Sequence, residues 1–318
     1  WNVIRDGQSV IEQFSIDEAE DAFDAKTRNS SAYVPARSIL KGVDQFDPAF
    51  FGMRPKEAAI TDPQGRVFLE ICQEALDDAG IDPARTSAAI GVYAGSPMST
   101  YMLENVLQDR AQIRNFTSGF QIDYAVLSGN DSADLATRVA FKLGLKGPAI
   151  AMNTACSTSL VAIAEACKSI RSGDSDVALA GGVSITFPQK RGYIFQESGM
   201  ASPDGLCRPF DIDAGGTVFG HGAGVIVLKS LANAKADGNH IHAVITGVGL
   251  NNDGADKMSY TAPSVAGQAG AIKAAHRDAG ISASDVGYVE CHGTATPLGD
   301  PIEVAGLALA FEGSDARC

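Results

Sequence analysis

A local pattern of helix, turn and strand occurs twice in this chain, 200 positions apart. The two copies share one tetrapeptide, Asp78-Ala79-Gly80-Ile81 and Asp278-Ala279-Gly280-Ile281. In each copy, apolar residues at helical spacing precede the tetrapeptide and a short apolar run follows it; these segments are residues 64–79, 89–94, 268–279 and 286–291. Solenoid repeats recur about every 20–50 residues. The longer period therefore predicts two similar half-domains.

Helix and strand patterns also alternate between the two copies. We expect helices at residues 135–143 and 157–172, and strands at residues 148–152, 177–180 and 225–228. Short apolar strands that alternate with helices are typical of a mostly parallel sheet covered on both faces. The sequence therefore predicts an α/β fold, with the Pro- and Gly-containing segment 187–216 as loop and cap.

The composition excludes several classes of protein. A formal net charge of −13 argues against a broad surface for nucleic acid or an anionic membrane. No apolar stretch reaches the roughly 18 residues that a membrane span needs. The six cysteines show no paired spacing, so we expect reduced thiols in a cytoplasmic protein.

Cys156 is the first candidate for chemistry. It lies in the segment Asn153-Thr154-Ala155-Cys156-Ser157-Thr158-Ser159, where an expected strand meets an expected helix. The positive end of the helix dipole favours a thiolate there, and small neighbours would let a substrate approach. This position predicts a nucleophile for acyl transfer. The alternative is a small cysteine buried in the core.

His292 is the second candidate, just past the end of the expected strand of the second copy. Ligands of parallel sheets bind at that edge. We expect a helix to follow, with Asp300 as N-cap, Pro301 in its first position and Glu303 in its third. The alternative for His292 is a hydrogen-bonded turn residue. Because of the repeat, Cys156 and His292 could converge on one cleft from two related halves.

Two other motifs favour structure over chemistry. Gly220-His221-Gly222-Ala223-Gly224 resembles a nucleotide-binding loop, but a strand follows it where that loop opens a helix. Close backbone packing is the better interpretation of these glycines. Cys291 and His292 are adjacent and would point to opposite faces of a strand, and no zinc spacing is present. We therefore expect no metal site.

Two segments carry a resemblance to a known family: TACSTS at residues 154–159 and HGTATPLGDPIE at residues 292–303. Together they resemble the β-ketoacyl synthase domains of modular polyketide synthases. Further segments occur in the family's order: Asp62-Pro63-Gln64, Gly129-Asn130-Asp131, Ser202-Pro203-Asp204-Gly205, Pro209-Phe210-Asp211, Asn251-Asn252-Asp253-Gly254 and Thr261-Ala262-Pro263.

The resemblance implies a thiolase-like fold of duplicated αβαβα layers with mostly parallel central sheets. Residues 1–235 would form the N-terminal half with its cap insertions, and residues 236–318 would begin an incomplete C-terminal half. Family members are usually homodimers.

The resemblance also implies decarboxylative Claisen condensation. Cys156 would accept an acyl chain from a phosphopantetheine thioester, and its backbone N–H would be one oxyanion donor. His292 would assist decarboxylation of a malonyl-type extender, and Thr294 and Thr296 would contact pantetheine. No cofactor would bind directly, because phosphopantetheine is carried by the partner acyl carrier protein. Neighbouring synthase domains would be further partners. A cysteine at position 156, where decarboxylating loading domains have Gln, implies condensation.

The chain departs from the family pattern at its ends. A Lys, a second His and a glycine-rich segment follow the HGT segment in relatives, and a first strand precedes the position of Trp1. We therefore expect a chain truncated at both ends, with unpaired sheet edges and poor stability. A non-catalytic, acyl-binding remnant of the same fold is one alternative function. A degradative thiolase is another, but HGTAT argues against it, and Cys318 is early for its second cysteine.

Overall fold

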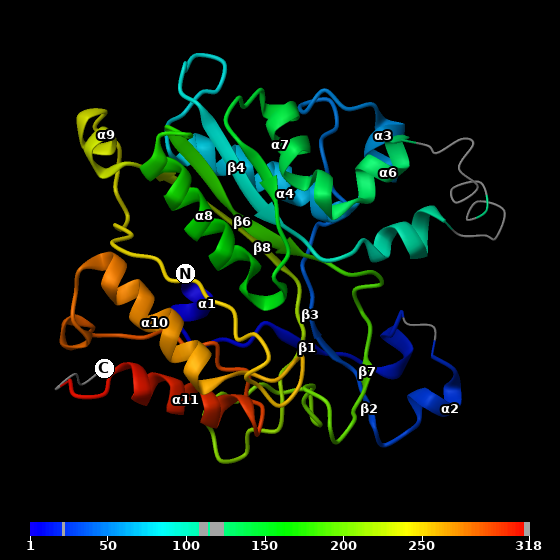
Figure 1. Cartoon of the computed structure of the whole chain (residues 1–318). Helices are drawn as coiled ribbons and strands as arrows, with labels where there is room; N and C mark the ends of the chain where they lie inside the picture. Colours follow the sequence, from blue (N-terminus) through cyan, green and yellow to red (C-terminus); the bar gives the residue numbers. More distant parts are fainter. Residues whose placement is uncertain (21–22, 108–113, 115–123, 315–318) are drawn as a thin grey trace. The chain divides into compact units, whose positions relative to one another are not determined.

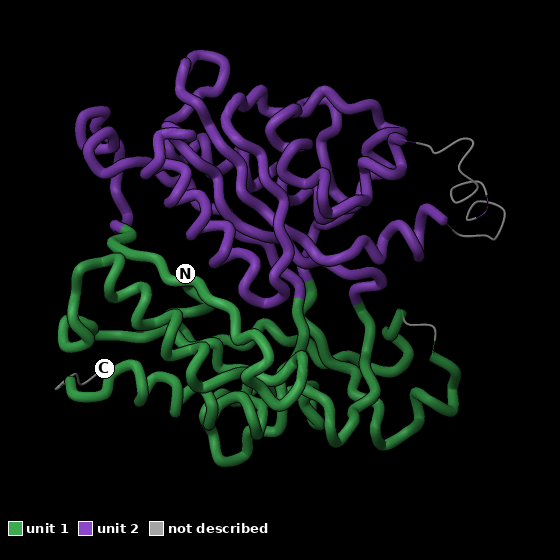
Figure 2. The backbone as a smooth tube through the Cα atoms, in the orientation of Figure 1, with its two compact units in different colours: residues 1–39, 190–220, 245–318 green, residues 40–189, 221–244 purple. Residues whose placement is uncertain are grey.

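The computed structural model describes residues 1–314 except 21–22, 108–113 and 115–123 (Figure 1). The chain divides into two compact units (Figure 2). Unit 1 contains residues 1–39, 190–220 and 245–318, and unit 2 contains residues 40–189 and 221–244. The predicted division into residues 1–235 and 236–318 stays a prediction.

A four-stranded sheet forms the centre of unit 2 (Figure 1). Its strands, in spatial order, are β5 (Ala149–Ala151), β4 (Ile90–Gly95), β6 (Val177–Ser184) and β8 (Gly222–Lys229). The pairings of β4 with β5 and with β6 are parallel, and the pairing of β6 with β8 is antiparallel. The predicted α/β class with a mostly parallel sheet is therefore confirmed.

Helices cover both faces of this sheet. Helices α4 (Pro63–Asp78) and α7 (Leu135–Leu143) cover one face, and α8 (Thr158–Ser172) covers the other. Unit 2 also contains α3 (Pro55–Ile60), α6 (Tyr124–Asn130) and α9 (Leu231–Ala236), with the shorter turns η2 (Met102–Val106), η3 (Ser132–Asp134) and η4 (Ala155–Ser157). Phe68 and Leu76 of α4 are fully buried in a core that includes Val92 and Leu179. On the other face, small α8 residues such as Ala162 pack in a second cluster. The two clusters explain why neither face of the sheet is polar.

Unit 1 contains two small antiparallel sheets, each of two strands. One pairs β1 (Ile11–Gln13) with β3 (Ala36–Ser38), and the other pairs β2 (Tyr33–Val34) with β7 (Tyr193–Ile194). Its helical segments are α1 (Asn2–Arg5), η1 (Ile16–Glu18), α2 (Ala25–Arg28), α10 (Val265–Ala279), η5 (Ala283–Asp285) and α11 (Gly299–Ala310). Helices α10 and α11 lie side by side (Figure 1), and a Cβ added to Gly306 would lie 3.0 Å from the Cβ of Gln268.

The predicted strand at residues 286–291 is wrong. Helix α10 and the left-handed Gly280 that ends it form as expected, as α4 and Gly80 do in the first copy. Residues 286–297 are irregular, however, and the Tyr288 side chain is exposed. A strand needs a hydrogen-bonded neighbour, and none of the described segments pairs with these residues. The structural repeat therefore ends at the turn.

Candidate functional site

Cys156 lies in a tight turn between β5 and α8. The turn is the short helix η4, and Ser157 is the residue that precedes α8. Ala155, directly before Cys156, has a φ of 57°. A residue other than glycine rarely adopts this conformation, and such residues cluster at functional sites. The expected strand-to-helix turn at the cysteine is therefore present.

Short-range hydrogen bonds hold this turn. The Thr154 N–H donates to Thr158 Oγ1 over 2.9 Å, and the same hydroxyl donates to the Ala155 carbonyl oxygen over 2.7 Å. The Ala155 N–H donates to Asn153 Oδ1 over 3.0 Å. The side chains of Thr158 and Asn153 thus bond the peptides of this turn, and these bonds hold Ala155 in its strained conformation.

The Cys156 side chain is exposed, whereas the side chains of Cys72 and Cys167 are buried. Burial also raises the pKa of the Cys72 thiol, which keeps that thiol protonated. The alternative of a small buried core cysteine therefore describes Cys72 and not Cys156.

A cavity of about 470 Å³ lies beside Cys156, entirely within unit 2. It is lined by the ends of β4, β6 and β8 and by the start of α8; the lining residues are Gly95, Ser96, Pro97, Asn153, Ala155, Cys156, Thr158, Ser159, Gly182, Val183, Ser184, Gly222, Ala223 and Gly224. No lining side chain is larger than valine, asparagine or proline. A volume of this size fits a small-molecule group next to the thiol.

His292 lies in a turn that a carboxylate holds through its backbone. The His292 N–H donates to Glu303 Oε1 over 2.6 Å, and the Gly293 N–H donates to Glu303 Oε2 over 2.9 Å. Both carboxylate oxygens of Glu303 accept hydrogen bonds from backbone N–H groups, so the exposed imidazole of His292 is left for other contacts. The sequence predicted Glu303 at a helix start but did not predict this contact, because the contact joins residues that are ten and eleven positions apart.

Thr294 and Thr296 lie together in the same turn. Their hydroxyl oxygens are 2.9 Å apart, and Thr296 Oγ1 also accepts from the Gly299 N–H over 3.0 Å. A Cβ on Gly299 would collide with both hydroxyls. Position 299 therefore needs glycine for the threonines to keep this arrangement.

The expected N-cap at Asp300 is wrong. Helix α11 begins at Gly299, two residues earlier than expected, because Thr296 satisfies the first N–H. The buried Asp300 carboxylate instead accepts the Phe210 N–H on Oδ2 over 2.7 Å. Phe210 has a φ of 61°, and a Cβ on Gly293 would lie 3.1 Å from Pro209 Cβ. The loop at 209–210 thus packs directly on the His292 turn.

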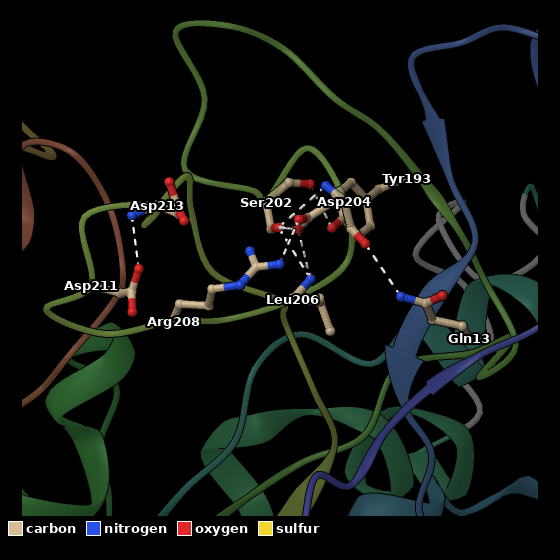
Figure 3. Close-up of polar contacts among 8 residues, drawn as sticks. All are labelled: Gln13, Tyr193, Ser202, Asp204, Leu206, Arg208, Asp211 and Asp213. Carbon is tan, nitrogen blue, oxygen red and sulfur yellow. Dashed lines mark hydrogen bonds and ion pairs between the residues drawn. The ribbon is translucent and has the colours of Figure 1, made fainter.

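Polar contacts order the preceding part of this loop (Figure 3). The Asp204 carboxylate accepts from Ser202 Oγ over 2.8 Å, from the Leu206 N–H over 3.1 Å and from Arg208 Nη2 over 2.9 Å. Tyr193 Oη donates to the Ser202 carbonyl oxygen over 2.8 Å, and burial raises the pKa of Tyr193 to about 12. Apart from the two-residue strand β7, the loop predicted at 187–216 is therefore irregular but well bonded.

Replacing Asp204 with Asn should destabilise the protein more at neutral than at acidic pH. The hydrogen bond from Arg208 is the largest cause of a lowered pKa at Asp204, and the hydrogen bonds from Ser202 and Leu206 lower this pKa further. A carboxylate with a lowered folded-state pKa stabilises the fold above its unfolded pKa, and the effect disappears as pH falls through the folded value. Urea unfolding at pH 7 and pH 3 measures the difference between wild type and variant. An equal difference at both pH values would contradict this assignment.

The structure places the predicted site residues in both units. Cys156 lies in unit 2, and His292, Thr294 and Thr296 lie together in unit 1. The convergence of Cys156 and His292 on one cleft stays a prediction.

The described residues contain no group of three or more His, Cys, Asp or Glu side chains that could hold a metal ion. Within the same part of the chain, no helix combines the length and the apolarity needed to cross a bilayer.

The predicted backbone packing at 220–224 is only partly right. A Cβ on Gly220 would lie 2.8 Å from Ser38 Cβ. At Gly222 and Gly224 it would meet nothing within 4 Å. His221 Nδ1 accepts the Thr186 N–H over 3.2 Å, which ties the loop after β6 to the start of β8.

Comparisons with known families and proteins agree across the chain. The family described as "Beta-ketoacyl synthase, N-terminal domain" matches residues 1–234, and "Beta-ketoacyl synthase, C-terminal domain" matches residues 242–318. A subunit of the phenolphthiocerol/phthiocerol polyketide synthase of Mycobacterium tuberculosis is 49% identical over 98% of this chain and 21% of that protein. Polyketide synthase ThaG of Burkholderia thailandensis is 40% identical over 100% of this chain and 6% of that protein.

Solved structures show the same relationship. Ketosynthase twelve of the bacillaene polyketide synthase of Bacillus amyloliquefaciens has a TM-score of 0.90 and 36% identity, over 100% of this chain and 55% of that one. A ketosynthase domain of Streptomyces albus JA3453 has a TM-score of 0.82 and 33% identity, over 99% of this chain and 53% of that one. This chain thus spans about half the length of these solved chains and a smaller part of the full synthases. The predicted thiolase-like fold is confirmed.

Proposed function

Because this chain belongs to the β-ketoacyl synthase family, as its motifs predicted, we propose that it extends polyketide chains by decarboxylative Claisen condensation, with Cys156 as the nucleophile. The observation that carries this proposal is the exposed Cys156 thiol on a strained strand-to-helix turn beside a cavity of about 470 Å³. A nucleophile on such a turn is open to an incoming carbonyl while its backbone is fixed.

The first step is acyl transfer. The Cys156 sulfur attacks the carbonyl carbon of an acyl thioester, and the bond from that carbon to the donor sulfur breaks. The donor sulfur takes up the proton that the Cys156 thiol gives up and leaves as a free thiol, and the Cys156 backbone N–H stabilises the negative charge that develops on the carbonyl oxygen. The acyl group then extends into the space beside the turn.

The second step forms the carbon–carbon bond. A malonyl-type thioester loses carbon dioxide, and the electron pair of the broken bond becomes an enolate. The enolate carbon attacks the acyl carbonyl on Cys156, and the bond to the Cys156 sulfur breaks to free the thiolate. His292 stabilises the enolate oxygen, because its imidazole is exposed while Glu303 fixes its backbone. The hydroxyl pair of Thr294 and Thr296 contacts the pantetheine arm.

The substrates imply the partners. An acyl carrier protein presents each thioester on phosphopantetheine, and neighbouring synthase domains supply and remove the chain. We assign the chain to a cytoplasmic homodimer that works within such an assembly. Its net charge of −13 requires a local basic patch to receive an acidic carrier.

Replacing His292 with Ala should slow decarboxylation of malonyl carrier protein by about 100-fold or more, because the charge on the enolate loses its donor. Acylation of Cys156 should change little, because that step does not use the imidazole. Release of carbon dioxide and the mass of the acylated protein measure the two steps separately.

His240→Ala is the matched control, because His240 lies in unit 2 on a segment outside both candidate turns. The Glu303 carboxylate holds peptide groups, so His292→Ala should keep its turn and its melting temperature. Unchanged decarboxylation in His292→Ala would refute the role of His292.

A further inference from the structure

Most of the buried polar side chains of the described residues come from three segments of unit 2. These segments are the start of α4 with the residues just before it, the residues after β4, and the end of α6; Thr61, Asp62, Gln64, Ser96, Ser99 and Asn130 are among the buried side chains. Burying a polar group costs free energy unless it has a hydrogen-bond partner. Within this group, Gln64 makes the side-chain bond that joins residues furthest apart in the sequence.

The Gln64 side chain is only 2% exposed, and it bonds three separate parts of the backbone and side chains around it. Its Oε1 accepts the Ile185 N–H over 3.1 Å. Its Nε2 donates to Asp62 Oδ2 over 3.0 Å and to the Pro97 carbonyl oxygen over 3.4 Å. A side-chain amide has one carbonyl oxygen and two N–H groups, which is enough for these three bonds. A side chain with donors alone or acceptors alone could not replace it.

The first distant partner, Pro97, lies in the segment that follows β4. In the same segment, the Ser96 carbonyl oxygen accepts a hydrogen bond from Asn153 Nδ2 over 3.4 Å. Asn153 Oδ1 accepts the Ala155 N–H over 3.0 Å, within the turn of the nucleophile. Hydrogen bonds and one peptide unit therefore connect Gln64 to the strained residue directly before the nucleophile.

The second distant partner, Ile185, directly follows β6, the strand that pairs with β4. Ile185 is fully buried, so its N–H needs a partner within the protein, and Gln64 supplies that partner. The preceding residue, Ser184, lines the same cavity as Cys156. Gln64 therefore bonds the backbone after two neighbouring strands, on both sides of the segment that holds the thiol.

We propose that Gln64 is a positioning residue for the acylation of Cys156. Gln64 does not line the cavity, so it acts through the two backbone segments that it holds beside the thiol. Fixed geometry lowers the barrier to reaction, and a displacement of about 1 Å caused by a remote substitution can cost about 100-fold in rate. This proposal rests on the proposed function, because its effect is measured on acyl transfer to Cys156.

Gln64→Met keeps the length of the side chain and removes its polar groups. It should lower the maximal rate of Cys156 acylation by acetyl-pantetheine about tenfold or more, because both segments lose their shared partner. The donor concentration at half the maximal rate should stay within about twofold of wild type, because Gln64 does not touch the donor. Gln64→Asn should act in the same direction, because an amide one carbon shorter cannot keep all three bonds. Intact-protein mass spectrometry over time gives each rate, at a temperature where circular dichroism shows each protein folded.

Two controls separate positioning from stability. Gln73→Met makes the same exchange in α4, at a partly exposed residue that donates to Asp77 Oδ1, and it should change neither acylation parameter. Ser175→Ala removes a buried hydrogen bond between the Ser169 and Ser175 hydroxyls, which are 2.8 Å apart. Ser175 precedes the start of β6, at the other end of the strand from the cavity. This variant should lower the melting temperature, as Gln64→Met does, but keep the wild-type rate of acylation.

Three results would overturn the assignment of Gln64 alone. They are an unchanged maximal rate in folded Gln64→Met or Gln64→Asn, a change confined to the half-saturating donor concentration, and an equal loss of rate in Ser175→Ala. If acetyl-pantetheine does not acylate the folded wild-type protein, the proposed function fails, and the assignment of Gln64 fails with it.

Discussion

Cys156→Ala is expected to reduce the condensation rate by at least about 10⁴-fold, the scale at which an enzyme loses its nucleophile. The described structure offers this role to one thiol on geometric grounds. Cys156 is exposed on a strained turn and lines a cavity, whereas the other described cysteines are buried or partly buried and do not line that cavity. The measurement is the formation of 3-ketoacyl product from an acyl-pantetheine thioester and malonyl carrier protein.

Cys207→Ala serves as the control for losing a thiol. Cys207 is partly exposed, and its sulfur lies 3.9 Å from Thr217 Oγ1 in unit 1. That variant should keep near wild-type activity. Product formation by Cys156→Ala at more than a few per cent of the wild-type rate would show that another group carries the acyl chain.

Gly95→Ala is expected to lower the free energy of unfolding by about 1–3 kcal/mol, the range seen when atoms are forced into a packed interior. A Cβ at this position would collide with the Met152 carbonyl oxygen and with Thr158 Cγ2. Both partners belong to the segment that places Cys156, because Thr158 Oγ1 bonds the Thr154 and Ala155 peptides. The substitution should therefore also slow acylation of Cys156. Urea unfolding and acylation rates measure the two effects.

Gly65→Ala is the matched control for this change. Gly65 lies in helix α4, and its added Cβ would lie 3.7 Å from Thr61 Cγ2, an ordinary contact. Alanine favours a helix over glycine, so this variant should be as stable as wild type or more stable. Equal stability of Gly95→Ala and wild type would mean that the β4 end is less tightly packed than its geometry indicates.

Helices α4, α7 and α8 of unit 2 could be predicted because their signals are local. Helix α4 follows Asp62, whose carboxylate accepts the Gln64 N–H, and it has Pro63 in its first turn. Helices α7 and α8 end at Gly144 and Gly173, both in the left-handed conformation. Start and stop residues of this kind act within one turn, so a single sequence contains them.

The features that the sequence did not predict depend on contacts between distant residues. An apolar run such as 286–291 can look like a strand, but a strand forms only beside a partner. The Asp300 contact with Phe210 joins residues 90 positions apart. An added Cβ at Gly222 or Gly224 would meet no atom within 4 Å. The sequence could not distinguish these two glycines from closely packed ones, because the packing depends on which distant segments surround them. Cys156 and His292 were found because each follows the end of an expected strand.

The role of Cys156 as the nucleophile is tested by the mass of the protein after incubation with an acyl-pantetheine thioester, followed by peptide mapping of the added group. We expect one acyl adduct, on Cys156, which is absent from Cys156→Ala. An unmodified wild-type protein that is folded, or an adduct on another cysteine, would contradict the assignment of Cys156 as the nucleophile.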